Sequence, residues 1–180
     1  EYAFIQYRIR AEIEYFIFLS SKARLFRALT PLELETARSL WQKFTLQDAE
    51  KIKEIEKTTK HDLKAIEYFI REKLEDTSLS DVLSFVHFGL TSYDITICAY
   101  GLMLEESRTD VVIPALETIC MSLKTLITES GDMTMLARTH GQPAVPTTMG
   151  KELAVFYSRI TQELEVLKTV KIEGKLNGAV

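Results

Sequence analysis

The segment ALETICMSLKTLITES, residues 115–130, decides the fold class of this chain. Its apolar side chains recur every three or four residues and so share one helix face; they are Leu116, Ile119, Leu123, Leu126 and Ile127. The helical pattern runs from Asp94 to Ser130, with Pro114 as a candidate kink because proline lacks the backbone N–H. Such long apolar stripes need partners to cover them. We therefore predict an all-α fold whose long helices form a bundle that packs further in an oligomer.

Further helices are predicted on both sides of this segment. Apolar stripes run through residues 2–25, 63–74 and 149–170. Helix-start signals stand at residues 30–33, where a threonine precedes Pro31 and Glu33, and again at residues 45–48. No segment shows the strict alternation expected of a β-strand. In the last helix we expect these side chains to face inward: Leu153, Phe156, Ile160, Leu164 and Leu167.

The breaks between stripes divide the chain into two predicted domains. We predict an N-terminal helical domain over residues 1–91 and the first part of a central helical-bundle domain over residues 92–180. The sequence begins at Glu1, without Met and already in helical periodicity, and it stops at Val180 without a stop signal. We therefore expect it to be an excerpt of a longer protein.

The composition narrows the class of function. Hydrophobic residues make up 46% and charged residues 27% of the chain, as in globular proteins, and the net charge is −4. This balance argues against nucleic acid and anionic membranes as partners, and no apolar run is expected to reach the length of a membrane span. Cys98 and Cys120 form neither a disulfide framework nor a metal motif. We expect free thiols in the cytoplasm and no metal.

The chain has three histidines, and each lies at or near a helix break. In TTKHDLKA, residues 58–65, His61 stands among lysines at the start of a helix, where free N–H groups and the helix dipole favour an anion. The alternative is a solvated charged turn with Asp62 as the helix cap, and the spacing alone favours that alternative. In GLTSYD, residues 89–94, Thr91 and Ser92 either cap the next helix or hold a carboxylate with the same atoms.

The third histidine lies in ARTHGQPAVPTT, residues 137–148. Gly141 permits a tight turn, the prolines stiffen the segment, and Thr147 or Thr148 is expected to cap the following helix. This loop would hold His140 in a fixed place, and a histidine near neutral pKa suits proton donation to a leaving group. The alternative is a structural histidine bonded to backbone. Neither a nucleophile motif nor metal-ligand spacing accompanies it.

Four segments together resemble one known family. TTKHDLKAIEYF, FVHFGLTSYDI, LARTHGQPAVPTTMGKE and KLNGAV have the order and approximate spacing of motifs in the adenylosuccinate lyase family, within the fumarase/aspartase superfamily. The resemblance covers residues 46–180. It implies β-elimination of fumarate, without cofactor or metal, from adenylosuccinate, giving AMP, and from the succinylated aminoimidazole-carboxamide ribotide of purine nucleotide biosynthesis. It also implies a cytoplasmic homotetramer with a small-molecule substrate and neither nucleic acid nor membrane as partner.

The resemblance also implies roles for particular residues. His140 matches the family's general acid, and Thr91 and Ser92 match the pair that binds a carboxylate of the succinyl group. The remaining matches are a substrate-binding segment, Lys60, His61 and Asp62, and two supporting residues, His87 and Thr139. The family's base is a serine in a Gly-Ser-Ser-x-Met-Pro loop, a signature that these 180 residues lack. We therefore expect this piece alone to be inactive.

Two alternatives stay open at the level of the sequence. Among enzymes, the alternative is another fumarate-releasing lyase, such as argininosuccinate lyase, but the basic cluster at residues 57–64 favours a phosphorylated substrate. From another class, a helical module without catalytic activity would carry the same apolar stripes.

Overall fold

The structure is a computed structural model that describes residues 1–176 and residue 178, and its helices pack in two separate units. The first unit comprises Glu1–Met103 with the described residues from Glu173 onward, and the second comprises Leu104–Ile172. This division differs from the predicted domain boundary after residue 91, which stays a prediction. Of the motif KLNGAV, Asn177, Ala179 and Val180 lie outside the described residues.

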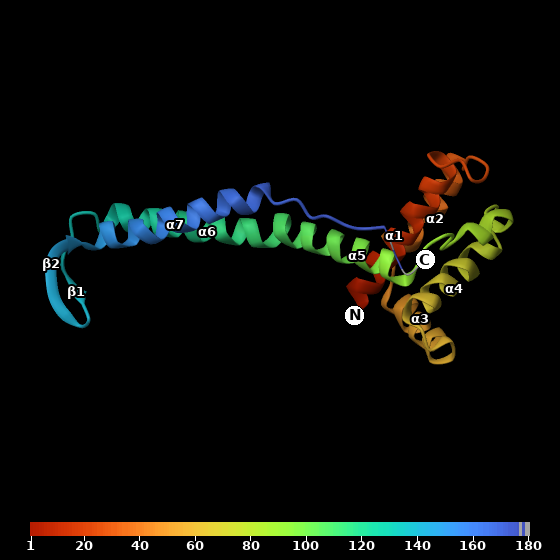
Figure 1. Cartoon of the computed structure of the whole chain (residues 1–180), viewed down its shortest axis with the longest axis horizontal. Helices are drawn as coiled ribbons and strands as arrows, with labels where there is room; N and C mark the ends of the chain where they lie inside the picture. The colour runs from red at the N-terminus through yellow and green to blue at the C-terminus, as the bar shows by residue number, and fades with distance from the viewer. Residues whose placement is uncertain (177, 179–180) are drawn as a thin grey trace. The chain divides into compact units, whose positions relative to one another are not determined.

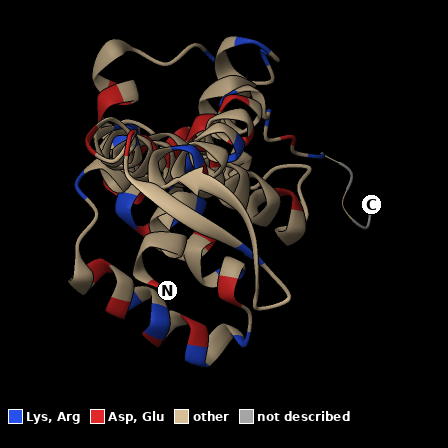
Figure 2. Cartoon of the chain, turned by 90° about the vertical axis from the view of Figure 1, so that its left-hand side faces the viewer, with Lys and Arg blue, Asp and Glu red and all other residues tan. Residues whose placement is uncertain are grey.

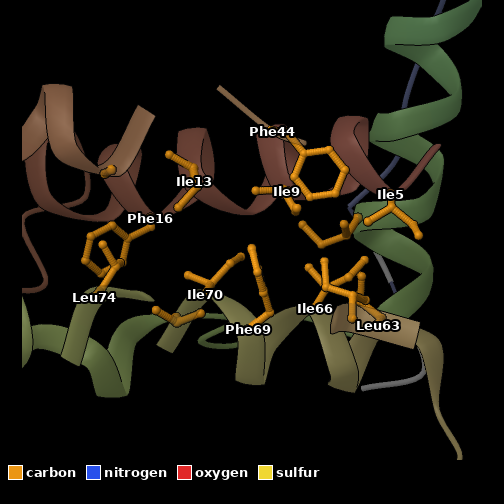
Figure 3. Close-up of a cluster of buried hydrophobic side chains, with 14 of the residues drawn as sticks. Ile5, Ile9, Ile13, Phe16, Phe44, Leu63, Ile66, Phe69, Ile70 and Leu74 are labelled. Carbon is orange, nitrogen blue, oxygen red and sulfur yellow. The ribbon is translucent and has the colours of Figure 1, made fainter. Parts of the chain in front are cut away.

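The first unit is built around two facing helices. It contains α1 (Tyr2–Ser21), α2 (Pro31–Gln42), α3 (Leu46–Thr59), α4 (Asp62–Glu75), the 3-10 helix η1 (Ser80–Phe85) and the start of α5 (Ser92–Ser107). Figure 3 shows Ile9, Ile13 and Phe16 of α1 facing Phe69 and Ile70 of α4, and all five side chains are buried. The apolar stripes predicted for both helices therefore form the core of this unit.

The helix starts in this unit follow their sequence signals. The Thr30 hydroxyl accepts a hydrogen bond from the Glu33 N–H, and the Glu33 carboxylate accepts one from the Thr30 N–H. Thr45 and Asp48 form the same reciprocal capping box at the start of α3. Both predicted helix starts are therefore confirmed. Each cap stabilises its helix because it satisfies N–H groups that the helix itself leaves free.

The surface of this unit carries charges of both signs. In Figure 2 acidic and basic residues are interspersed along the helices. Lys73 on α4 pairs with Asp48 on α3 at 2.8 Å, and Lys51 pairs with Glu72 between the same helices. These pairs are partly exposed, so each contributes little to stability.

The second unit consists of two long helices joined by a hairpin. It contains the end of α5, a π-helical turn η2 (Arg108–Val112), α6 (Ile113–Glu129), the strands β1 (Thr134–Thr139) and β2 (Gln142–Thr148), and α7 (Met149–Thr169). Helices α6 and α7 run side by side, and the hairpin lies at one end of them (Figure 1). Arg108 donates to the carbonyl of Leu167 at 2.9 Å, which joins the π turn to the end of α7. The π turn immediately precedes Pro114, which cannot donate to the helix ladder.

The hairpin corrects the prediction that residues 137–148 form a loop and that the chain holds no strand. β1 and β2 pair antiparallel, from Thr134 opposite Thr148 to Thr139 opposite Gln142, with an irregularity between Leu136 and Arg138. A strand is recognised in a sequence by strict alternation of apolar and polar residues. Two prolines in β2 and this irregularity in the pairing break that alternation. A two-stranded sheet has only edge strands, where proline is tolerated. The fold is otherwise helical, so the predicted fold class is confirmed.

The base of the hairpin depends on a close approach of two glycines. The Gly150 N–H donates to the carbonyl of Ser130 at 3.0 Å. A Cβ added at Gly150 would lie 2.7 Å from the Cα of Gly131. The start of α7 and the end of α6 therefore meet backbone to backbone.

The second unit buries little of its apolar surface. Among the described residues α6 has none that is buried, and α7 has two, Gly150 and Leu164. Phe156, which we expected to face inward, is 57% exposed, so that prediction is wrong for the single chain. The continuous helical run Ser92–Glu129 is long and apolar enough to cross a membrane by length and composition alone, contrary to the sequence prediction, and its most apolar part is only 6% buried. An exposed apolar surface of this size marks a site of interaction with another molecule or with another part of the protein.

Candidate active site

The predicted substrate-binding segment lies at the break between α3 and α4, beside a cavity of about 410 Å³. Lys60 ends α3 in the left-handed conformation, with φ of 54°, and so turns the chain sharply. Lys60, His61 and Asp62 line the cavity together with Phe4 and Arg8 of α1. The structure therefore brings this basic segment to a concave surface of the first unit.

His61, and not Asp62, caps α4. The Nδ1 atom of His61 accepts a hydrogen bond from the Lys64 N–H at 3.2 Å, and Asp62 accepts one from its neighbour Leu63. The prediction that Asp62 caps this helix is therefore wrong. Asp62 is already the first residue of α4, and its carboxylate accepts from the N–H of the next residue, Leu63.

Arg8 joins this segment to the start of α5. Its guanidinium contacts the Asp62 carboxylate at 2.7 Å, donates to the Thr96 hydroxyl at 3.3 Å and lies 3.9 Å from the centre of the Phe4 ring. Its Nε is buried without a hydrogen-bond partner among the described residues. Partial burial opposes ionisation of Asp62, but the Leu63 N–H and Arg8 outweigh it and lower the pKa of that carboxyl. Arg8 was not predicted from the sequence, although an arginine between the buried isoleucines Ile5 and Ile9 of α1 is a visible signal.

Thr91 and Ser92 stand at the start of α5. The N–H and the hydroxyl of Thr91 both donate to one oxygen of the Asp94 carboxylate, each at 2.9 Å. Asp94 is 3% exposed, so this cap is held within the unit. The geometry is that of a helix cap, and it leaves carboxylate binding by the two hydroxyl residues a prediction.

His87 is held by a buried carboxylate. It has φ of 61° and its Nδ1 lies 2.6 Å from Oε1 of Glu12 on α1. The hydrogen bond to Glu12 raises the pKa of His87 above its usual value, and partial burial opposes this effect. His87 was predicted from the sequence, but Glu12 was not. The signal of Glu12 is a carboxylate on the buried stripe of α1.

His140 lies in the turn at the tip of the hairpin, between Thr139 and Gln142, which pair with each other. His140 and Gly141 have φ of 50° and 74°, so both residues of the two-residue turn are in the left-handed region. This is the backbone of a type I′ turn, whose twist matches that of the paired strands. Thr139 ends β1, and both Thr139 and His140 are exposed. The turn thus presents the His140 imidazole at the exposed end of the hairpin.

The end of the hairpin is fixed to α7 by two threonines. The Thr148 hydroxyl accepts from the Lys151 N–H at 3.2 Å, so Thr148 is the cap of the two threonines between which the sequence left the choice open. The Thr147 hydroxyl donates to the Glu152 carboxylate at 3.0 Å. A capped helix at one end supports the position of His140 at the other.

The predicted site residues are divided between the units. The first unit holds Lys60, His61, Asp62, His87, Thr91 and Ser92, and the second holds Thr139 and His140. Arg8 connects Asp62 with the helix that Thr91 begins, so the structure brings these two groups of the first unit together. Within the described residues, no group of three or more His, Cys, Asp or Glu side chains is placed to hold a metal ion.

Comparison with protein families decides the relationship. A family model described as lyase matches residues 26–180. The chain belongs to the lyase family. This confirms the resemblance found in the sequence motifs, which placed the chain among adenylosuccinate lyases of the fumarase/aspartase superfamily.

Curated members of the lyase family match almost the whole chain. The adenylosuccinate lyase of Dictyostelium discoideum is 46% identical over 93% of this chain and 37% of its own length. The enzymes of Legionella pneumophila and Escherichia coli are 40% and 37% identical over 100% of this chain, which covers 40% of each. The chain therefore spans about two-fifths of the length of these relatives.

Solved structures of a cycloisomerase and of a fumarate lyase share the fold. β-Carboxy-cis,cis-muconate cycloisomerase from Acinetobacter calcoaceticus superposes with a TM-score of 0.78 at 19% identity, over 100% of this chain and 41% of its own. Fumarate lyase from Mesorhizobium gives a TM-score of 0.75 at 17% identity, over 93% of this chain and 37% of its own. Identities this low speak for the fold alone.

Proposed function

We propose that the full-length protein is an adenylosuccinate lyase, a carbon–nitrogen lyase that releases fumarate from adenylosuccinate, giving AMP. It acts in the same way on the succinylated aminoimidazole-carboxamide ribotide of purine nucleotide biosynthesis. The observation that carries the proposal is the identity of 37–46% to curated adenylosuccinate lyases over 93–100% of the chain. The same relatives favour this activity over that of an argininosuccinate lyase or of a helical module without catalytic activity.

The reaction assigns a proton to His140. A base removes a proton from the succinyl carbon next to a carboxylate, and the electron pair forms the double bond of fumarate. The C–N bond breaks, and the leaving nitrogen takes a proton from His140, the general acid. A positioned acid contributes about 10²–10⁴-fold to the rate. The base is a serine outside these 180 residues.

The first unit supplies the binding groups in this proposal. Removal of the proton builds negative charge on the neighbouring carboxylate. Donors at Thr91 and Ser92 stabilise that charge once the Thr91 hydroxyl turns from Asp94 to the substrate. Lys60, His61 and Asp62 bind the substrate beside their cavity, where the start of α4 favours an anion. His87 and Thr139 support the substrate position.

We further propose that the protein is a cytoplasmic homotetramer. Support comes from the uncovered apolar side chains of α6 and α7, which a second copy of the same helices would bury. Charged residues interrupt the long helix, among them Arg108, Asp110 and Lys124. A protein partner accommodates these charges at the edge of an interface, whereas a lipid core does not.

The proposal is tested by following fumarate release from adenylosuccinate by absorbance, with the full-length protein and its His140→Asn variant. Asparagine tolerates positive φ, so the turn survives and only the imidazole is lost. We expect turnover to fall by about 10²–10⁴-fold. The matched control is Arg24→Asn, which replaces another exposed residue with φ of 54° and should leave turnover unchanged.

Two results contradict different parts of the proposal. If the unmodified protein releases no fumarate from either substrate, the assigned activity is wrong. If the unmodified protein is active and His140→Asn retains near-normal turnover, the activity stands and the assignment of the general acid is wrong.

A further inference from the structure

The contact between Glu12 and His87 has features that fold stability alone does not explain. The Glu12 side chain is completely buried, although an isolated carboxylate is costly to remove from water. One of its oxygens contacts His87 Nδ1 at 2.6 Å, and the other, Oε2, is buried without a partner among the described residues. A carboxylate retained in this arrangement is held for its effect on the histidine.

The charges around the pair come from α1 and α4. Lys64 and Glu67 on α4 face it, but they pair with each other at 2.6 Å, and Glu67 also contacts Arg71 at 3.0 Å. Burial raises the pKa of Glu12, and the hydrogen bond to Glu12 raises the pKa of His87. Both shifts favour a pair that keeps one proton and is neutral as a whole, which is the state that burial stabilises.

The backbone of His87 has a conformation that a residue other than glycine rarely adopts unless its surroundings hold it. Its φ of 61° lies in the left-handed region, and Gly89 two residues later has φ of 70°. The neighbouring carbonyl of Phe88 accepts a hydrogen bond from the Tyr15 hydroxyl at 3.1 Å. Helix α1 thus holds this turn at two points, through Glu12 and Tyr15. These contacts stabilise the strained backbone conformation of His87.

We propose that Glu12 is a positioning residue that holds the His87 ring by Nδ1, so that its Nε2–H serves as a hydrogen-bond donor to an anionic oxygen of the substrate. The inference rests on the proposed lyase function and deepens it. The His87 side chain is 17% exposed, and Nε2 lies across the ring from the nitrogen that Glu12 contacts. Because a carboxylate accepts from Nδ1–H, Nε2 carries a hydrogen only while the ring is protonated. Glu12 favours that protonated state by raising the pKa of His87 and fixes the direction of Nε2–H.

The inference predicts a particular pH dependence of substrate binding. A protonated His87 attracts an anion, and this attraction is present below its pKa and is lost as the pH rises through it. Glu12→Gln removes the carboxylate that raises this pKa but leaves the burial that lowers it. KM should therefore begin to rise at a lower pH in the variant than in the unmodified protein. In the pH range where the two profiles differ, we expect KM to be raised about tenfold, which is the loss of one hydrogen bond from a charged donor.

The experiment measures kcat and KM for fumarate release between pH 6 and 9, using the full-length protein. The variants are Glu12→Gln, Glu12→Asp, His87→Gln and the double variant Glu12→Gln/His87→Gln. Glu12→Asp keeps the charge on a shorter side chain and should restore part of the pH profile. In the His87→Gln background, Glu12→Gln should raise KM no further, because its effect acts through the imidazole.

A control separates this effect from a loss of folding. Glu33 is a buried carboxylate of α2 that pairs with Arg27 and has no contact with His87. Glu33→Gln should lower the melting temperature and leave the pH profile of KM unchanged. If Glu12→Gln does not fold, His87→Gln and Glu12→Asp still carry the test, because His87→Gln alone must raise KM and flatten its pH dependence.

The inference is overturned if the unmodified protein is active and Glu12→Gln keeps its pH profile of KM. It is also overturned if Glu12→Gln raises KM equally with and without His87, or if His87→Gln leaves KM unchanged. A failure of the proposed function looks different, since the unmodified protein itself would then release no fumarate.

Discussion

The two units of this chain use the same apolar spacing and reach opposite results. In the first unit the stripes of α1 and α4 meet, and side chains such as Ile9 and Ile70 are fully buried. In the second unit α6 and α7 lie side by side, yet α6 buries no residue among those described and Leu164 is the one buried side chain of α7 that is larger than glycine. An apolar period of three to four residues therefore specifies a helix without specifying which chain covers it.

The difference also separates the roles of the units. The first unit has its own core, which supports Arg8, Glu12 and the cap at Thr91 in fixed positions. The second unit presents His140 on a hairpin whose supporting helices remain largely uncovered. We expect the stability of the first unit to be intrinsic and that of the second to depend on association.

The largest effect should come from breaking the core of the first unit. Phe69 is 1% exposed and packs edge to face with Phe44 at a ring separation of 6.4 Å. Phe69→Ala leaves a cavity and should cost about 3–5 kcal/mol of unfolding free energy. The measurement is urea denaturation of the full-length protein, at two protein concentrations. A loss below about 1 kcal/mol, or one that depends on concentration, would contradict an intrinsic core.

A smaller effect of another kind should follow from the same type of change in the second unit. Phe156 is 57% exposed in the single chain, so Phe156→Ala removes few contacts within it. If association covers this face, burying a phenylalanine side chain contributes about 1.5–3 kcal/mol to each interface. Sedimentation of the full-length variant should show dissociation at concentrations where the unmodified protein stays assembled. Unchanged assembly would place Phe156 outside the interface.

The smallest effect should come from a charge at a helix start of the first unit. Arg27, followed by the Thr30 N–H, lowers the pKa of Glu33 from its usual 4.5 to about 2. A lowered pKa means that Glu33 stabilises the fold above pH 4.5, and that this contribution is lost as the pH falls through about 2. Glu33→Gln should therefore lower the melting temperature by about 2–4 °C near neutral pH.

The pH series provides the check on this last prediction. The difference in melting temperature between Glu33→Gln and the unmodified protein should narrow below pH 4.5 and close near pH 2. Asp81→Asn removes the exposed partner of Arg27 and should have the smaller effect. A difference that is constant with pH would assign the loss to packing and not to the charge.

The sequence predicted the helices well because their signals are local. The capping boxes at Thr30 and Thr45 and the cap at Thr148 use residues within one turn, and each lies where it was predicted. The hairpin was missed because two prolines in β2 and an irregular register hide its alternation. The one clear signal of the hairpin was Gly141 in a two-residue turn. Histidine rarely precedes the glycine of such a turn, where asparagine, aspartate or glycine is preferred.

The residues of the candidate site that the sequence did not predict are those held by long-range contacts. His61, His87, Thr91 and His140 were singled out by their place at helix breaks and by the family resemblance. Arg8 and Glu12 were missed, because a charged residue on an apolar stripe is explained only by the partner that it meets. The contacts of Glu12 with His87 and of Arg8 with Asp62 join residues 75 and 54 positions apart, which no local pattern encodes.

The left-handed backbone of His140 sets the proposed catalytic role of this residue against local stability. A turn of this type is most stable with Asn-Gly, and a histidine there costs roughly 1 kcal/mol. Selection for a stable hairpin alone would therefore replace the imidazole. The proposed general acid would be retained only under selection for turnover, which makes position 140 a place where a better-folded variant is also a poorer enzyme.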